Sequence, residues 1–238
     1  MRTDGRAADE MRKVNITLGF SKFAEGSCLI EVGNTMVLCN ASVEEKVPAH
    51  VTSGGWVTAE YSMLPRANRQ RSRRDVSKLK LSTRSAEIQR LIGRSLRCAM
   101  DLQKLGPRTI TIDCDVLQGD GGTRTASVTG GFIAMTLACR KLLESKIIDE
   151  MPVRTYVAGI SAGIVHNDAM LDLCYEEDSR AMVDLNCIMT AEGDIVELQA
   201  TGEGRPFSMD EEKKLVHMCR KGNLVLTQME RRCLGGLE

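Results

Sequence analysis

The sequence predicts an α+β fold, and three patterns support this class. Segments rich in β-forming residues outnumber the helical segments, they occur as neighbouring hairpins, and long helices lie between groups of strands. Apolar residues make up 42% of the 238 residues and aromatic residues only 3%, so the core must be built mainly from aliphatic side chains. The chain contains no linker, low-complexity tract or strong internal repeat, and we therefore expect a single domain over residues 1–238.

The first quarter of the chain predicts four strands. Residues 13–18 alternate between polar and apolar side chains, as a half-buried strand does. Residues 27–32 and 35–43 are rich in β-formers, and the two residues Gly-Asn between them are typical of a hairpin turn. Residues 56–61 predict the fourth strand.

A basic segment follows these strands. Residues 65–80 contain almost no large apolar side chains and predict an exposed, mobile loop. Up to residue 84 the segment holds one acid, Asp75, and eight basic residues: Arg66, Arg69, Arg71, Arg73, Arg74, Lys78, Lys80 and Arg84. The formal net charge of the whole chain is zero, so the rest of the chain must carry an equal excess of negative charge. The excess of positive charge is therefore concentrated in this segment. Such runs are often only solvated surface, but arginine predominates and suits phosphate, which favours binding of a nucleic acid.

A helix is expected from Ser82 or Thr83 to Leu105, where Gly-Pro ends it. Its buried stripe recurs at helical spacing and consists of Ile88, Leu91, Ile92, Leu96 and Met100. Arginines lie on another face of this helix, at Arg90, Arg94 and Arg97. They either line a channel for the nucleic acid or pair with acids elsewhere, and the sequence leaves both open.

The second half of the chain predicts the remaining elements. Strands are expected at 109–116, 156–165, 169–175, 184–190 and 195–201, with helices at 125–145, 177–182 and 208–234. Ser208 followed by Glu211 is the capping-box pattern of a helix start.

A glycine turn joins the expected strand at 109–116 to the following helix, with the sequence QGDGGTRTA over 118–126. Glycines let backbone N–H groups converge on a ligand, and the helix N-terminus adds partial positive charge. Arg124 adds a full charge, so the turn predicts a phosphate site. It is neither a P-loop nor a dinucleotide fingerprint, and a tight strand–helix connection is the alternative.

Two carboxylates form a second group. Asp178 and Asp184 flank a short turn between two expected strands. They could bind Mg²⁺ through oxygen ligands, or one could act as a general acid. The alternative is that acids near a helix N-terminus only stabilise its dipole. The three histidines share no spacing with a Ser or Cys nucleophile, so a catalytic triad is not indicated.

Several classes of protein are excluded at this stage. No stretch approaches the roughly 20 apolar residues of a membrane span, and the polar N-terminus lacks the core of a signal peptide. The nine cysteines are scattered singly, which indicates reduced thiols and hence the cytoplasm.

At the level of longer motifs, the chain resembles the ribonuclease PH family over essentially its whole length. The matching segments are residues 2–12, EGS at 25–27, VTAEY at 57–61, MLPR at 63–66, RSAEIQRLIGR at 84–94, DCDVLQGDGGTRTA at 113–126, and YEEDS at 175–179 with Asp184. The resemblance implies a fold like ribosomal protein S5 domain 2, assembled as a hexameric ring of three dimers. It also implies a phosphorolytic 3′→5′ exoribonuclease that trims transfer RNA precursors, releases nucleoside 5′-diphosphates and runs reversibly.

The resemblance also assigns residues. The phosphate would lie between Arg84 and the turn Gly122, Thr123 and Arg124, with Thr125 close by. The carboxylates Asp178 and Asp184 would be catalytic and would bind Mg²⁺. RNA would be gripped by the arginines of the loop and of the next helix: Arg66, Arg71, Arg74, Arg90 and Arg94.

Three positions depart from the pattern of the family, which usually has Gly at Thr83, Thr at Ser85 and Ala at Gly119. None of them removes a charged group. Some relatives are silent RNA-binding ring subunits that lack these arginines or aspartates, which this chain retains. A hydrolytic Mg²⁺ nuclease is disfavoured, because water needs no arginine-lined turn.

Overall fold

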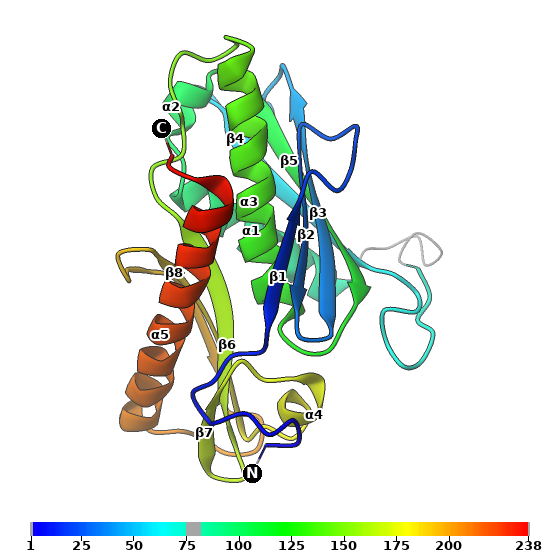
Figure 1. Cartoon of the computed structure of the whole chain (residues 1–238), viewed down its shortest axis with the longest axis vertical. Helices are drawn as coiled ribbons and strands as arrows, with labels where there is room; N and C mark the ends of the chain where they lie inside the picture. The colour runs from blue at the N-terminus through cyan, green and yellow to red at the C-terminus, as the bar shows by residue number, and fades with distance from the viewer. Residues whose placement is uncertain (1, 75–81, 238) are drawn as a thin grey trace.

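A computed structural model describes residues 2–74 and 82–237 and shows the expected α+β fold (Figure 1). Asp75, Lys78 and Lys80 of the basic segment lie outside the described residues. A five-stranded sheet has the order β1-β2-β3-β5-β4, and a four-stranded sheet has the order β7-β6-β8-β9. The strands of the first sheet are β1 (Val14–Leu18), β2 (Gly26–Val32), β3 (Thr35–Glu44), β4 (Trp56–Met63) and β5 (Thr109–Gln118).

The second sheet and the helices complete the fold. Its strands are β6 (Val157–Val165), β7 (Asp168–Leu171), β8 (Val183–Thr190) and β9 (Ile195–Thr201). The helices are α1 (Thr83–Cys98), α2 (Leu102–Leu105), α3 (Thr123–Glu144), α4 (Tyr175–Asp178) and α5 (Met209–Leu234). This is the fold of ribosomal protein S5 domain 2.

The elements form four layers with α3 near the centre (Figure 1). α3 packs against β2 and β3 on one side and against β6 on the other, so nearly all of its faces are buried. α1 covers β4 beside it, and α5 covers the opposite face of the second sheet. Successive residues of β6 therefore face different helices. Ile160 packs in the apolar cluster that includes side chains of α5, whereas Val157 packs in the cluster that includes side chains of α3.

Several turn and cap predictions are confirmed. Gly33, with φ +57°, begins the two-residue turn of a hairpin, and the residues on either side of the turn, Val32 and Thr35, pair with each other. Ser82 is the N-cap of α1, and its hydroxyl accepts from the backbone N–H of Ser85. The capping box that begins α5 is present as well.

The expected helix to Leu105 is wrong, because α1 ends at Cys98. The backbone after it pairs with a distant segment: Arg154 N–H donates to the Ala99 carbonyl, and Asp101 N–H donates to the Pro152 carbonyl. Asp101 then caps the separate helix α2. Pairing between residues 51 and 55 positions apart leaves no periodic signal in the local sequence.

Two further boundaries differ from expectation. The strand expected to reach Tyr175 ends at Leu171, because Asp172 has φ +52° and turns the chain away from the sheet. The helical turn expected at 177–182 lies at 175–178 instead, where the side chain of Glu177 accepts from the N-cap backbone of Cys174. α3 begins two residues early, at Thr123, with Gly122 in the left-handed region as its N-cap.

No helix of the described residues is long and apolar enough to cross a membrane.

Candidate active site

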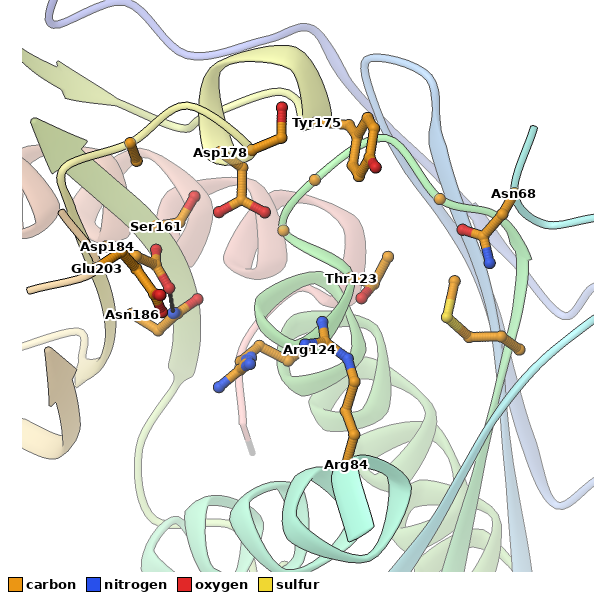
Figure 2. Close-up of a pocket in the computed structure, with 16 residues that line it drawn as sticks. Asn68, Arg84, Thr123, Arg124, Ser161, Tyr175, Asp178, Asp184, Asn186 and Glu203 are labelled. Atoms are coloured by element: carbon orange, nitrogen blue, oxygen red, sulfur yellow. Dashed lines mark hydrogen bonds between the residues drawn. The ribbon is translucent and has the colours of Figure 1, made fainter. Parts of the chain in front are cut away.

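A cavity of about 600 Å³ opens where the N-termini of α1 and α3 meet α4 and the start of β8 (Figure 2). Of the residues expected to react or to bind phosphate, it brings together Arg84, Gly122, Thr123, Arg124, Asp178 and Asp184. These residues come from segments up to 100 positions apart, and their convergence supports one shared site.

The glycine turn forms one wall of this cavity. Gly121 and Gly122 have φ +80° and +66°, which glycine adopts without strain. A Cβ on Gly121 would collide with the Leu173 carbonyl and the backbone of Tyr175, so only glycine lets the turn approach α4. The first N–H groups of α3 have no partner within the helix and add positive potential at this wall.

Two threonines at the start of α3 have different surroundings. The Thr123 hydroxyl lies on the cavity wall and shares a hydrogen bond of 2.8 Å with the phenol of Tyr61. The Thr125 hydroxyl donates to the Gly122 carbonyl at 2.9 Å, and this side chain is 4% exposed and not part of the cavity wall. The role of Thr125 as a phosphate ligand therefore stays a prediction, because its hydroxyl is engaged by the Gly122 carbonyl.

The side chains of Arg84 and Arg124 lie together below the glycine turn in Figure 2. Arg124 Nη1 donates to Gln199 Oε1 at 2.8 Å and lies 3.6 Å from Glu87 Oε1. Gln199 Nε2 in turn donates to the same oxygen of Glu87 at 2.9 Å. Because β9 and α1 both contact it, the guanidinium of Arg124 is held in one orientation.

The two carboxylates lie across the cavity from these arginines (Figure 2). Burial, and then the charge of Asp178, raises the pKa of Asp184 to about 6, against the effects of Arg124 and Asn186. Burial also raises the pKa of Asp178, against the effects of Arg84 and Arg124. Both carboxyl groups are thus placed where excess negative charge is costly.

The donor set fits a divalent cation. Asp184 Oδ2 accepts from Asn186 Nδ2 at 3.0 Å, whereas its buried Oδ1 has no hydrogen-bond partner among the described residues. An unpartnered carboxylate oxygen beside a second carboxylate suits Mg²⁺, which keeps several waters when few side chains bind it. The described residues hold no cluster of three or more His, Cys, Asp or Glu that could bind a metal.

An arginine from the N-terminal segment clamps the glycine turn. Arg12 donates to the carbonyls of Asp120 and Gly121, and its Nη2 and Nε donate to the Asp172 carboxylate at 2.6 and 3.0 Å. The Arg12 backbone N–H also donates to Asp172 Oδ2 at 2.7 Å. This pair fixes the glycine turn to the segment that leads to Asp178.

A second arginine, Arg2, also binds the segment that leads to Asp178. Arg2 makes two 2.8 Å hydrogen bonds to the Glu177 carboxylate and donates to the carbonyls of Leu171 and Asp172. Arg2 and Glu177 are 6% and 5% exposed. The sequence predicts no role for either arginine, because each depends on an acidic partner at least 160 residues away.

The arginines expected to bind RNA lie outside this cavity. Arg71 and Arg74 are exposed in the loop, Arg90 is exposed on α1, and Arg66 lines a neighbouring cavity of about 690 Å³. Both cavities are lined by Asn68 and Gly119, so the two lie side by side. Arg94 differs from the others, because its Nη2 lies 2.9 Å from Glu197 Oε1. For Arg94 the structure realises the alternative of pairing with an acid.

Other residues of the cavity wall were missed by sequence reasoning. They are Met63, Asn68, Ser161, Tyr175, Asn186 and Glu203. The charge of Glu203 raises the pKa of both Asp178 and Asp184, although burial is the larger cause for each. Asn186 carried one signal, since it stands two residues after Asp184 and so faces the same side of a strand. Met63 and Tyr175 lie in segments that resemble the family, but no role was assigned to them, and Asn68, Ser161 and Glu203 have no signal in their local sequence.

Comparisons with known proteins agree along the whole chain. Residues 10–141 match domain 1 and residues 155–222 match domain 2 of the 3′ exoribonuclease family. A ribonuclease PH of Bacillus velezensis is 54% identical and covers 99% of this chain and 97% of its own length. A ribonuclease PH of Solibacter usitatus is 52% identical, covering 99% of this chain and 100% of its own length.

A solved structure of the Archaeoglobus fulgidus exosome with RNA bound to the active site has the same fold. Its TM-score is 0.81 at 23% identity, and the match covers 98% of this chain and 92% of that one.

Proposed function

The chain belongs to the 3′ exoribonuclease family and is a phosphate-dependent 3′→5′ exoribonuclease, and we propose that the cavity between α1, α3 and β8 is its active site. One observation supports this most strongly: Arg84 and Arg124 flank the N-terminus of α3 directly across from Asp178 and Asp184. Such a site holds an anion on one side and a proton donor or cation on the other.

Inorganic phosphate is held between the arginines and the glycine turn, where it is positioned as the nucleophile. One of its oxygens forms a bond to the phosphorus of the last diester, and the bond from phosphorus to the 3′-oxygen breaks. The terminal nucleotide leaves as a nucleoside 5′-diphosphate, and the 3′-oxygen takes a proton. Arg84, Arg124 and the helix N–H groups offset the repulsion between two anions, which is the main obstacle to this reaction.

The carboxylates serve the leaving side. In the absence of a cation, Asp184, whose pKa burial raises to about 6, is positioned to donate a proton to the departing 3′-oxygen. Asp178 and Asp184 would hold Mg²⁺, which supplies positive charge to the diester when bound. Asn186 orients Asp184 through its 3.0 Å hydrogen bond to Oδ2, and Oδ1 has no hydrogen-bond partner among the described residues.

The substrate is a 3′-extended transfer RNA precursor in this proposal. Exposed arginines lie on the loop and on α1, and Arg66 among them lines the neighbouring cavity. In this proposal they contact the acceptor stem: Arg66, Arg71, Arg74 and Arg90. Phosphate contacts by arginine give affinity with little dependence on sequence. Arg94 contributes less, because Glu197 already neutralises it.

We also propose a homohexamer built as three dimers, acting in the cytoplasm. Large apolar side chains are exposed on two surfaces that neighbouring subunits would cover. They are Phe20 and Phe23 between β1 and β2, and Leu224 and Val225 on α5. All nine cysteines are free, which suits a reducing compartment. Light scattering gives the mass directly, and a monomer in solution would contradict the ring.

The test of the site is the phosphate dependence of Arg124→Ala. A hydrogen bond to a charged group contributes about 1.5–3 kcal/mol, so we expect the KM for phosphate to rise roughly 10- to 150-fold. Arg140→Ala is the matched control, because Arg140 lies near the other end of the same helix. An Arg124→Ala enzyme with the phosphate KM of the control would remove this arginine from the phosphate site.

A further inference from the structure

Charged groups occupy only part of the cavity wall. The arginines and carboxylates described above face one another on one side of the glycine turn (Figure 2). On the other side the wall is formed by the thioether of Met63, the amide of Asn68 and the phenol of Tyr175. Figure 2 shows Asn68 on the far side of the turn from Asp184, with Tyr175 between them. An uncharged wall next to a phosphate site is suited to the nucleoside part of a nucleotide.

The ring of Tyr175 is exposed at the cavity although it is the first residue of a helix. Its exposed fraction is 53%, in a chain that contains only three tyrosines. Its backbone N–H donates to Asp120 Oδ1 at 3.3 Å, and the missing Cβ of Gly121 allows this approach. The turn that faces phosphate therefore also sets the position of the ring.

Gly119 leaves space beside Met63 and Asn68 on the same wall. A Cβ built there would lie 3.0 Å from Met63 Cε and 3.5 Å from Asn68 Oδ1. The backbone of Gly119 does not have positive φ, so conformational strain does not require glycine at this position. The resemblance to the family leads one to expect alanine here, and its absence widens the gap between Met63 and Asn68.

We propose that Tyr175, Met63 and Asn68 form a subsite for the nucleobase of the terminal nucleotide. The phenol ring stacks on the base, the thioether contacts its edge, and the Asn68 amide offers both donors and an acceptor. Stacking on an aromatic ring tolerates every base, which suits an enzyme that removes successive nucleotides. A cavity of about 600 Å³ is within the usual range for small-molecule sites. This inference rests on the proposed function, because it completes the same site.

The test compares ligands with and without a base. Calorimetry measures the binding of ADP, CDP and pyrophosphate to the wild type, Tyr175→Ala and Tyr175→Phe. We expect Tyr175→Ala to weaken ADP binding about 5- to 150-fold, as loss of one base-stacking contact does. Tyr175→Phe retains the ring and should bind ADP within about twofold of the wild type. Pyrophosphate has no base, so its affinity should not change in either variant.

The relative loss for two bases adds a second readout. A purine stacks over a larger area than a pyrimidine, so Tyr175→Ala should lose more affinity for ADP than for CDP. Gly119→Ala narrows the gap beside Met63 and should weaken ADP binding while sparing pyrophosphate. Met209→Ala is the control for removal of an exposed apolar side chain, because Met209 is 68% exposed and does not line the cavity. Tyr175→Leu replaces Tyr175→Ala if the smaller side chain destabilises α4.

The outcomes separate this inference from the proposed function. Equal losses for ADP and pyrophosphate in Tyr175→Ala would show that the ring only supports the turn, and would overturn the subsite. Unchanged ADP binding in that variant would overturn it as well. A wild type that binds neither pyrophosphate nor phosphate would instead contradict the phosphate site itself.

Discussion

The buried pair of Arg12 and Asp172 is predicted to hold the two halves of the active site together. Asp172→Asn is the informative change, because asparagine tolerates the φ of +52° at this position and the substitution removes only the charge. The carboxylate accepts from three N–H groups of Arg12, and the two side chains are 5% and 4% exposed. Removing one partner of such a pair leaves a buried charge uncompensated, at a cost of about 3–5 kcal/mol.

For a chain of this size that cost corresponds to a fall in Tm of roughly 6–20 °C. The KM for phosphate should rise as well, because Arg12 also binds the carbonyls of Asp120 and Gly121. Thermal unfolding followed by circular dichroism and phosphate titration of the activity measure the two effects. Asp168→Asn is the control, since Asp168 is an exposed acid near the same segment. A variant with the Tm and the phosphate KM of this control would refute the argument that the pair positions the turn.

Three further predictions concern other parts of the molecule. Replacing Arg66, Arg71 and Arg74 together by Ala should weaken the binding of transfer RNA. The slope of log affinity against log salt concentration should fall by the equivalent of about three phosphate contacts, and an unchanged slope would show that the loop does not contact RNA. Asp184→Asn should abolish turnover and leave RNA binding intact, so normal rates would exclude Asp184 from the mechanism. Burial raises the pKa of Glu230 far above its usual value, so this group destabilises the fold increasingly as pH rises above 4.5, by about 1.4 kcal/mol per pH unit until its folded pKa. Glu230→Gln should therefore raise the Tm at pH 8 and not at pH 4, and equal shifts at both would contradict the burial of an uncharged carboxyl.

The parts of the site that the sequence predicted are those encoded within a short segment. The glycine turn, Arg124 and the start of α3 are consecutive, so turn chemistry and helix capping identify them together. Asp178 and Asp184 are also close in sequence. Their placement in one cavity could be anticipated from their spacing, although the absence of a partner for Asp184 Oδ1 could not, and their binding of a cation stays a prediction.

The parts that were missed depend on contacts between distant segments. Gln199 reaches Arg124 from 75 residues away, and Arg2 reaches Glu177 from 175 residues away. The prediction for the end of α1 was wrong for the same reason, because the Ala99 carbonyl accepts from the distant Arg154 N–H instead of continuing the helix. Propensity and periodicity describe only local preferences, and tertiary contacts override them where the backbone has a competing partner.

The central claim is that inorganic phosphate is the nucleophile at Arg84 and Arg124. The most direct measurement is the digestion of a 3′-extended transfer RNA with Mg²⁺, with and without phosphate, followed by identification of the released nucleotide. The account predicts nucleoside 5′-diphosphates that appear only with phosphate and that decrease sharply in Arg124→Ala. Nucleoside monophosphates released without phosphate would show hydrolysis and would contradict it.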